Sequence, residues 1–181
     1  MKIYTHGNKE LLNKDCIGLF CSRLIPLSIY YSAFDFLKLL MNQTVTIGSG
    51  WHSPLEKKAL KSRDAEAKSS LIFFLAKGIN HYKVDESIKC EIENGKILIV
   101  SQWDEAKRID QNKADQRNRY MLETLDRHLF LSINTGGNLE KIYKDSLEME
   151  KNVYILDHPT NAAWINNGAF AISNHNIKEL I

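Results

Sequence analysis

The chain is short of cysteine and proline, and these shortages exclude some classes of protein. Its three cysteines, Cys16, Cys21 and Cys90, leave an odd one over and form no CxxC motif. Because they also lack recognised zinc-ligand spacing, neither a disulfide-rich secreted domain nor a metal site is expected, and reduced thiols in the cytoplasm are the simplest interpretation. The 181 residues contain three prolines and no low-complexity linker, and their number suits one domain with a full core.

Long hydrophobic runs and a strong charge of one sign are also missing. The most apolar stretch, residues 17–40, is interrupted by Arg23, Asp35 and Lys38, so it does not predict a membrane span. Residues 1–14 are polar and lack the apolar core of a signal peptide. The formal charge of +2 is too small to identify a dedicated nucleic-acid binder, so any basic surface must be local. We therefore expect a cytoplasmic protein without a membrane partner.

Two motifs of nucleotide enzymes are absent from the sequence. It contains no complete P-loop and no GxGxxG. Hydrolysis of nucleoside triphosphates and dinucleotide redox chemistry therefore lack support, and no cofactor is expected.

Short apolar segments alternate with amphipathic ones along the chain, which predicts a parallel α/β sheet. Strands are expected at residues 17–21, 44–47, 69–75, 96–100, 128–133 and 153–156. Helices are expected at residues 27–41, from residue 54 onward, and at residues 82–93, 117–126 and 139–150. The polar stretch 101–116 is expected to be partly loop. The sequence thus predicts a doubly wound, mostly parallel α/β domain over residues 1–181, with residues 1–15 as an N-terminal extension packed on the core.

Polar loops, most of them glycine-bearing, directly follow four of these strands. Such loops emerge at one edge of a parallel sheet, where helix N-termini and free backbone N–H groups favour phosphate. Ser22 and Arg23 follow the first strand, and a hydroxyl beside a guanidinium can hold a phosphate. The Gly48-Ser49-Gly50 loop lets a phosphate approach the backbone. The alternatives are an N-cap with a surface arginine, and a plain turn.

Other residues near these loops carry two interpretations each. Trp51 could stack on a base and His52 could contact a phosphate, or both could be packing residues without contact to a ligand. Glu56 could act as a general base or bind a ribose hydroxyl, or it could be the dipole partner of a first helical turn.

The order of the motifs resembles the Rossmann-like core of the DprA/Smf DNA-processing proteins. The matching segments are Gly7-Asn8, residues 17–23, residues 45–50, Gln116-Arg117-Asn118-Arg119, residues 136–139, and Asn161 with Gly168-Ala169. The resemblance covers most of the chain and implies a Rossmann-like fold, binding of single-stranded DNA or a nucleotide, a recombinase as partner and a homodimer. Cys21 replaces the family's usual glycine, and residues 51–56 replace its longer Gly-Ile-Asp and His segment, as in a compact, divergent branch.

The resemblance also implies a set of ligand-binding residues at the loop edge. They are Ser22, Arg23, Gly48, Ser49, Gly50, Lys77, Arg117, Asn118, Gly136, Gly137 and Asn138. Arg117 and Arg119 are two residues apart at the expected start of a helix and so do not share a helix face. We expect Arg117 to face the ligand and Arg119 to form an internal ion pair with Glu123 or Asp126.

An enzyme is the rival interpretation. The Gly136-Gly137 loop is also similar to that of LOG-type nucleoside monophosphate phosphoribohydrolases, in which Glu140 or Glu56 would act as the acid/base. That family has a further Gly-Thr before the acid, and this chain lacks it, which argues against glycosidic hydrolysis. A nucleotide-signal sensor without catalysis is a third interpretation.

Overall fold

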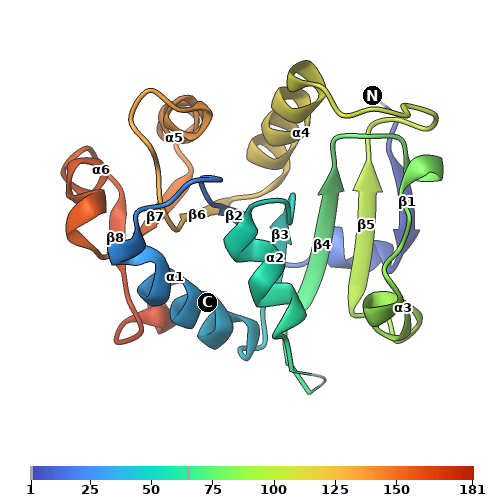
Figure 1. Cartoon of the computed structure of the whole chain (residues 1–181), viewed down its shortest axis with the longest axis horizontal. Helices are drawn as coiled ribbons and strands as arrows, with labels where there is room; N and C mark the ends of the chain where they lie inside the picture. The colour runs from blue at the N-terminus through green and yellow to red at the C-terminus, as the bar shows by residue number, and fades with distance from the viewer. Residues whose placement is uncertain (1, 65) are drawn as a thin grey trace.

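One eight-stranded sheet forms the centre of the computed structural model, which describes residues 2–64 and 66–181 (Figure 1). The strand order is β1-β5-β4-β3-β2-β6-β7-β8. Strand β1 is antiparallel to β5, and every other neighbouring pair is parallel. The strands are β1 (Tyr4–Gly7), β2 (Cys16–Phe20), β3 (Thr46–Ser49), β4 (Ser70–Leu75), β5 (Ile97–Ser101), β6 (Arg127–Phe130), β7 (Asn152–Leu156) and β8 (Phe170–Ile172).

Helices cover both faces of this sheet. They are α1 (Leu27–Met41), α2 (Pro54–Lys61), α3 (Glu86–Glu93), α4 (Gln111–Thr124), α5 (Asn138–Glu148) and α6 (Ala162–Asn166), with short 3₁₀ helices at Lys9–Asn13, Ile79–His81, Pro159–Asn161 and Ile177–Glu179. Because both faces are covered, β2, β3 and β5 are buried at every position. The predicted doubly wound, mostly parallel α/β fold is confirmed.

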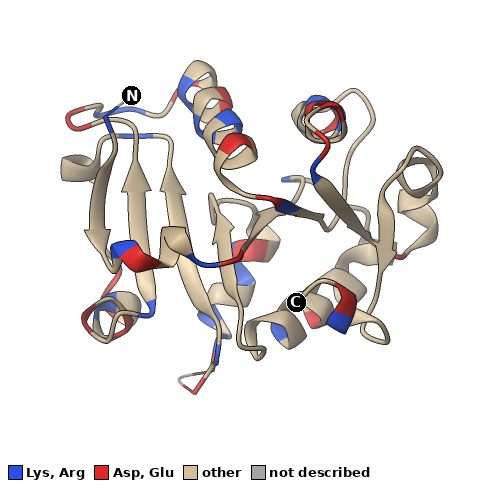
Figure 2. Cartoon of the chain, turned by 180° about the vertical axis from the view of Figure 1, so that it is seen from behind, with Lys and Arg blue, Asp and Glu red and all other residues tan. Residues whose placement is uncertain are grey.

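Side chains of alternate strand residues enter two separate hydrophobic cores. Ile17 and Leu19 of β2 pack in one core, with α1, α2 and α3. Phe20 of the same strand packs in the other, with α4, α5 and α6. This period of two is what a pleated strand imposes. Figure 2 shows that acidic and basic residues are mixed over the helices and loops, while the central strands carry few charges.

The chain reverses its direction of winding beside β2. Strands β3, β4 and β5 are added on one side of β2, and the connection through α4 then returns to place β6 on its other side. The carboxyl ends of β2, β3 and β6 therefore surround the switch point, where open α/β sheets bind ligands.

Two helix boundaries differ from the sequence-based prediction. Helix α4 begins at Gln111, and Asp110 caps it by accepting a hydrogen bond from the Lys113 backbone N–H (2.8 Å). The expected start at Arg117 was wrong because the first turns of α4 are polar on all sides, so they lack an apolar stripe. Helix α3 begins at Glu86, after the Asp85 cap, so residues 82–85 lie outside the helix that was expected to include them. A separate 3₁₀ helix ends before them at His81.

Strands β1 and β8 were not predicted as strands. They are the two edge strands, and β1 is partly exposed along its length, so its sequence carries no continuous apolar run. Residues 2–15 include β1 and the first 3₁₀ helix, whose Leu11 is completely buried in the second core. None of the helices in the described part of the chain combines the length and apolar character that a membrane span needs.

Candidate nucleic-acid-binding pocket

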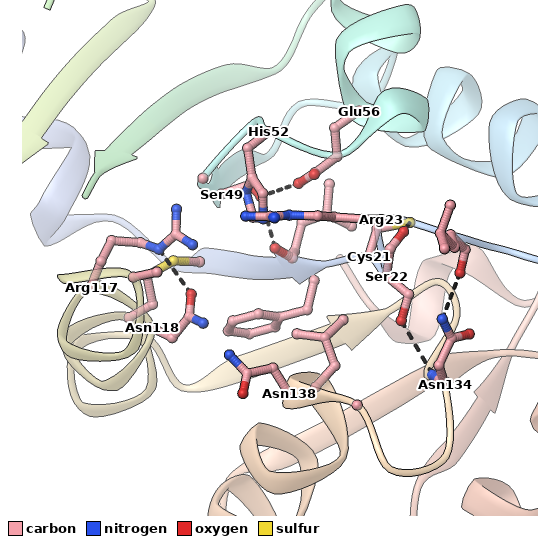
Figure 3. Close-up of a pocket in the computed structure, with 18 of the residues that line it drawn as sticks. Cys21, Ser22, Arg23, Ser49, His52, Glu56, Arg117, Asn118, Asn134 and Asn138 are labelled. Carbon is pink, nitrogen blue, oxygen red and sulfur yellow. Dashed lines mark hydrogen bonds between the residues drawn. The ribbon is translucent and has the colours of Figure 1, made fainter. Parts of the chain in front are cut away.

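A cavity of about 300 Å³ lies at the carboxyl ends of β2, β3 and β6, between α2, α4 and α5 (Figure 3). Its walls come from four segments that are distant in the sequence: the end of β2 with the loop after it, the loop after β3 with the start of α2, one face of α4 from Gln111 onward, and the loop before α5. The polar residues around it include Ser22, Arg23, Ser49, Gly50, His52, Glu56, Gln111, Arg117, Asn118, Asn134, Gly137 and Asn138.

Arg117 is the buried cation of this pocket, and 5% of the residue is exposed. Its Nε donates to Asn118 Oδ1 (2.8 Å) and its Nη1 to the Phe74 carbonyl (3.4 Å). No carboxylate forms an ion pair with it among the described residues. Burial lowers the pKa of Arg117 to about 10, partly opposed by the charge of Glu56, so the guanidinium stays charged at neutral pH.

Gly50 provides the space that the guanidinium occupies. A Cβ atom at this position would overlap Nη1 of Arg117 and lie 2.7 Å from Nδ1 of His52. The glycine of this loop is therefore required by a close side-chain approach from α4, whereas the sequence suggested a close approach of phosphate.

The carboxylate of Glu56 is hydrogen-bonded at the N-terminus of α2. Glu56 is 1% exposed, and its carboxylate accepts hydrogen bonds from Ser49 Oγ and from the Ser53 backbone N–H (2.8 Å). Ser53 Oγ accepts in turn from the Glu56 backbone N–H (3.2 Å), which completes a capping box at the start of α2. Both carboxylate oxygens are thus occupied by neighbouring groups.

His52 lies in the pocket wall with Nδ1 buried and without a hydrogen-bond partner among the described residues. Burial lowers the pKa of His52; Glu56 opposes this shift, and the nearby charges of Arg117, Arg23 and Lys57 add to it. The ring is therefore neutral at pH 7.

Trp51, the neighbour of His52, packs inward. It is 4% exposed, adopts a positive φ of 48° and donates from Nε1 to the Ile72 carbonyl (2.9 Å). Its ring lies in the first hydrophobic core beside Phe73. It is a packing residue, and its ring is not available to a base.

Hydrogen bonds join the loops after β2 and β6. The Asn134 backbone N–H donates to Ser22 Oγ (3.2 Å), and Asn134 Nδ2 donates to the Leu24 carbonyl (2.7 Å). Asn134 was not proposed as a ligand residue from the sequence; its position directly after the strand expected at residues 128–133 was the available signal. Cys21, where the family has glycine, also lines the pocket, and burial raises its pKa to about 12, so it remains a neutral thiol.

The structure brings most of the predicted ligand residues to one cavity. Ser22, Arg23, Ser49, Gly50, Arg117, Asn118, Gly137 and Asn138 all line it.

Three of the predicted ligand residues lie elsewhere. Gly48 is inside β3, where a Cβ would lie 2.7 Å from the Phe74 ring. The carbonyl of Lys77 accepts a hydrogen bond from Ser101 Oγ (2.7 Å) beyond β4. Gly136, with a φ of 75°, lies on the outer side of its loop.

Glu140 also lies outside this cavity. It accepts a hydrogen bond from the Gly136 backbone N–H (2.7 Å) and forms an ion pair with Lys144 (2.7 Å). These contacts stabilise its own loop. In the described part of the chain, no three His, Cys, Asp or Glu side chains are grouped so that they could share a metal ion.

Comparison with known proteins identifies the family. The model of the DNA recombination-mediator protein A family matches residues 1–179. The chain belongs to this family. The resemblance inferred from the order of the motifs is thereby confirmed, and no curated protein sequence gives a significant match.

Solved structures of DprA proteins share the fold. DprA from Streptococcus pneumoniae is 14% identical with a TM-score of 0.77; the alignment covers 98% of this chain and 65% of that one, so the chain spans less than two thirds of its length. DprA from Helicobacter pylori, whose structure describes a single-stranded DNA binding mode, is 16% identical with a TM-score of 0.74, and the alignment covers 98% of this chain and 83% of that one.

A molybdenum cofactor binding protein from Rippkaea orientalis is a more distant structural relative. It is 15% identical with a TM-score of 0.55, and the alignment covers 92% of this chain and 94% of that one. At these low sequence identities, the structural similarities establish the fold alone.

Proposed function

We propose that this protein binds single-stranded DNA and that one phosphate of the strand, with its nucleotide, enters the pocket at Arg117. The observation that carries this proposal is a buried guanidinium without a carboxylate partner in the described part of the chain. A guanidinium has five N–H donors, and the described residues accept from two of its nitrogens. Glu56 compensates this buried charge only in part and without an ion pair, and such a charge is costly, so its retention supports an anionic ligand.

Two further donor groups lie near Arg117 in the pocket. Because Asn118 Oδ1 accepts from Arg117, its Nδ2 is left to donate toward the cavity. Arg23 adds a second cation at the mouth. A pocket with this many donors suits phosphate, which only accepts. The Helicobacter pylori relative, which binds single-stranded DNA, supports a polymeric ligand.

A phosphoribohydrolase is less well supported than a binding protein. Such an enzyme needs a carboxylate that is free to exchange protons with substrate. Glu56 is held in a capping box and Glu140 in a loop contact outside the cavity. The proposed site therefore consists of Arg117 with Ser22, Arg23, Ser49, Gly50, Asn118, Gly137 and Asn138, and it has no catalytic role.

Two further parts complete the proposal. A recombinase is the protein partner, which membership in a family named for mediating recombination supports, and the DNA-bound form is a homodimer in the cytoplasm. Co-sedimentation of the protein with a purified recombinase and labelled DNA tests the first part, and sedimentation velocity tests the second.

Substitution of Arg117 tests the site. Arg117→Ala should weaken binding of a fluorescein-labelled oligothymidylate by about 10- to 100-fold in anisotropy titrations, since a charged donor group is lost. Arg117→Lys should recover part of this loss, because a point charge cannot reproduce the guanidinium fork. The slope of log affinity against log salt should also fall in Arg117→Ala, by roughly 0.7 for one phosphate contact.

Arg119→Ala is the matched control two residues along the same helix. It forms the expected ion pair with Glu123 (2.8 Å), but the pair lies at the surface and not in the interior, since the Arg119 side chain is 79% exposed. Loss of this pair should therefore cost little stability. Affinity within twofold of wild type is expected for this variant. Equal losses in both variants, or tight mononucleotide binding with no response to oligonucleotides, would contradict the proposal.

A further inference from the structure

Three large apolar side chains are exposed in the segment that leads from the pocket into α1. Leu24 is 80% exposed, Leu27 75% and Tyr31 66%. Leu24 lines the pocket itself, Leu27 is the first residue of α1, and Tyr31 follows one turn later on the same face of the helix. We call these three residues the Tyr31 surface. It continues the pocket outward along the first turns of α1.

Cations border the Tyr31 surface on the side of the pocket and of α2. Arg23 directly precedes Leu24 in the sequence, lines the pocket and is exposed. Lys58 of α2 lies over two aromatic rings of α1, 5.2 Å from the centre of Tyr30 and 5.0 Å from that of Phe34. The ring of Tyr30 meets that of Tyr31 edge to face, with centroids 5.6 Å apart. The basic border is therefore adjacent to the exposed aromatic ring.

Two further charges define the limits of this surface. Lys57 is exposed on α2, and its charge reaches the pocket, since it helps to lower the pKa of His52. Asp35 is exposed one turn beyond Tyr31 on α1. An acidic side chain repels phosphates, so Asp35 marks the end of the surface away from the pocket.

We propose that the DNA strand leaves the pocket across the Tyr31 surface, with one base stacked on Tyr31 and its neighbour packed against Leu24 and Leu27. The phosphates of this segment lie along Arg23 and the lysines of α2. Proteins that bind single strands without base preference combine an aromatic ring for stacking with cations along the backbone, and this surface offers both next to the proposed phosphate site. The inference rests on the proposed function and extends its site.

A second copy of the chain is the competing occupant. A stable protein interface buries roughly 800 Å² on each partner, with a mostly uncharged centre. The Tyr31 surface has three apolar side chains between Arg23 and Asp35, which is small for such an interface and suits a segment of two or three nucleotides. Its continuity with a phosphate-binding cavity also favours the strand.

Length-dependent binding tests the proposal. Two labelled probes are compared: a dithymidylate, chosen to occupy the pocket without reaching Tyr31, and an oligothymidylate of about 16 nucleotides, chosen to cover both the pocket and the Tyr31 surface. Tyr31→Ala should weaken binding of the long probe by about tenfold, the loss of one stacked base, and leave dithymidylate binding unchanged. Tyr31→Phe should retain wild-type binding of both probes.

Tyr4→Ala is the control for loss of an aromatic ring. Tyr4 is a partly exposed tyrosine with Lys2 over its ring (4.9 Å), but it lies on edge strand β1, four strands away from β2. Its substitution should leave the affinity for the long probe unchanged. In Tyr31→Trp, addition of the long probe should quench the new indole emission, because a stacked base lies on the ring.

The outcomes separate this proposal from the proposed function. Wild-type affinity for the long probe in Tyr31→Ala, or unquenched emission in Tyr31→Trp, overturns the Tyr31 surface while Arg117→Ala still tests the pocket. If the wild-type protein binds neither the dithymidylate nor the long probe, the proposed function itself is overturned. Self-association without DNA that is lost in Tyr31→Ala would assign the surface to a second copy and also overturn the inference.

Discussion

Arg117 places a positive charge in a site that water barely reaches. A buried guanidinium without an ion pair costs stability, and the lowered pKa of Arg117 is a direct expression of that cost. Asn118 fixes the orientation of the guanidinium, and Gly50 leaves room for it. Arg117 thus supplies the charge for ligand binding, and Asn118 and Gly50 act by positioning its guanidinium.

Gly50→Ala should therefore resemble Arg117→Ala in its effect on DNA binding. The added methyl group overlaps Nη1 and forces the guanidinium out of its place, so affinity for the oligothymidylate should fall by about tenfold. The double variant Gly50→Ala/Arg117→Ala should bind no more weakly than Arg117→Ala alone, because both changes remove the same interaction. Anisotropy titrations of the three variants measure this coupling.

Gly136→Asn is the control for substitution of a glycine at the same edge. Gly136 has a positive φ, which asparagine tolerates, and an added Cβ would meet nothing within 4 Å. We expect its affinity to remain near wild type. Strictly additive losses in the Gly50→Ala/Arg117→Ala double variant would show that Gly50 acts independently of the arginine.

At the scale of elements, helix ends hold the pocket walls in place. Strand β3 passes into α2 through the Gly50 loop, and the capping box of Ser53 and Glu56 stabilises that turn. Helix α4 crosses from β5 to β6 and delivers Arg117 and Asn118 from its middle turns. Because Arg117 comes from α4 and the capping box belongs to α2, a loosened α2 cap should affect stability more than binding.

Ser53→Ala should lower the free energy of unfolding by about 1 kcal/mol, the usual effect of removing a side-chain N-cap. Ser62→Ala provides the same chemical change at the C-terminal end of α2, where Ser62 Oγ donates to the Ala59 carbonyl (3.1 Å). Its effect should be within about 0.5 kcal/mol. Urea denaturation measures the free energy of unfolding of both variants. Equal losses of stability in the two would contradict the capping role of Ser53.

At the scale of the whole molecule, the sheet joins two cores and buries polar groups that stabilise it at neutral pH. His128 of β6 is completely buried; its Nε2–H donates to the Leu125 carbonyl (3.1 Å), and its Nδ1 accepts from Ser146 Oγ. Burial, and secondarily the charge of Lys151, lowers the pKa of His128 to about 4 from its ordinary 6.5. The native state thus holds a neutral imidazole that the unfolded chain would protonate.

Stability should consequently fall as the pH is lowered from about 6.5 towards 4, because the unfolded state binds a proton that the native state does not. At about pH 5 the loss attributable to His128 is about 2 kcal/mol relative to pH 7. Urea unfolding of the wild type, His128→Gln and His175→Gln at the two pH values measures it. The loss should shrink in His128→Gln and persist in His175→Gln, whose side chain is exposed; an unchanged loss in His128→Gln would refute the assignment.

The sequence by itself determined the fold class and one edge of the pocket. Apolar segments with a period of two or near 3.6 identified the strands and helices of the core, and short polar loops after them located Ser22, Arg23, Gly50 and Gly137. These are local properties. A buried parallel strand must be apolar, and the loop that follows it must emerge at the carboxyl edge, whatever the rest of the chain does.

Only the tertiary structure decided which polar side chains are buried and with which groups they form hydrogen bonds or ion pairs. The start of α4 was missed because its first turns are solvated, and Arg117 became a buried cation only when α4 was placed against Gly50. The capping contacts of Glu56 likewise depend on Ser49 at the end of β3. Burial and pairing arise from contacts between residues distant in the chain, and local periodicity carries no information about them.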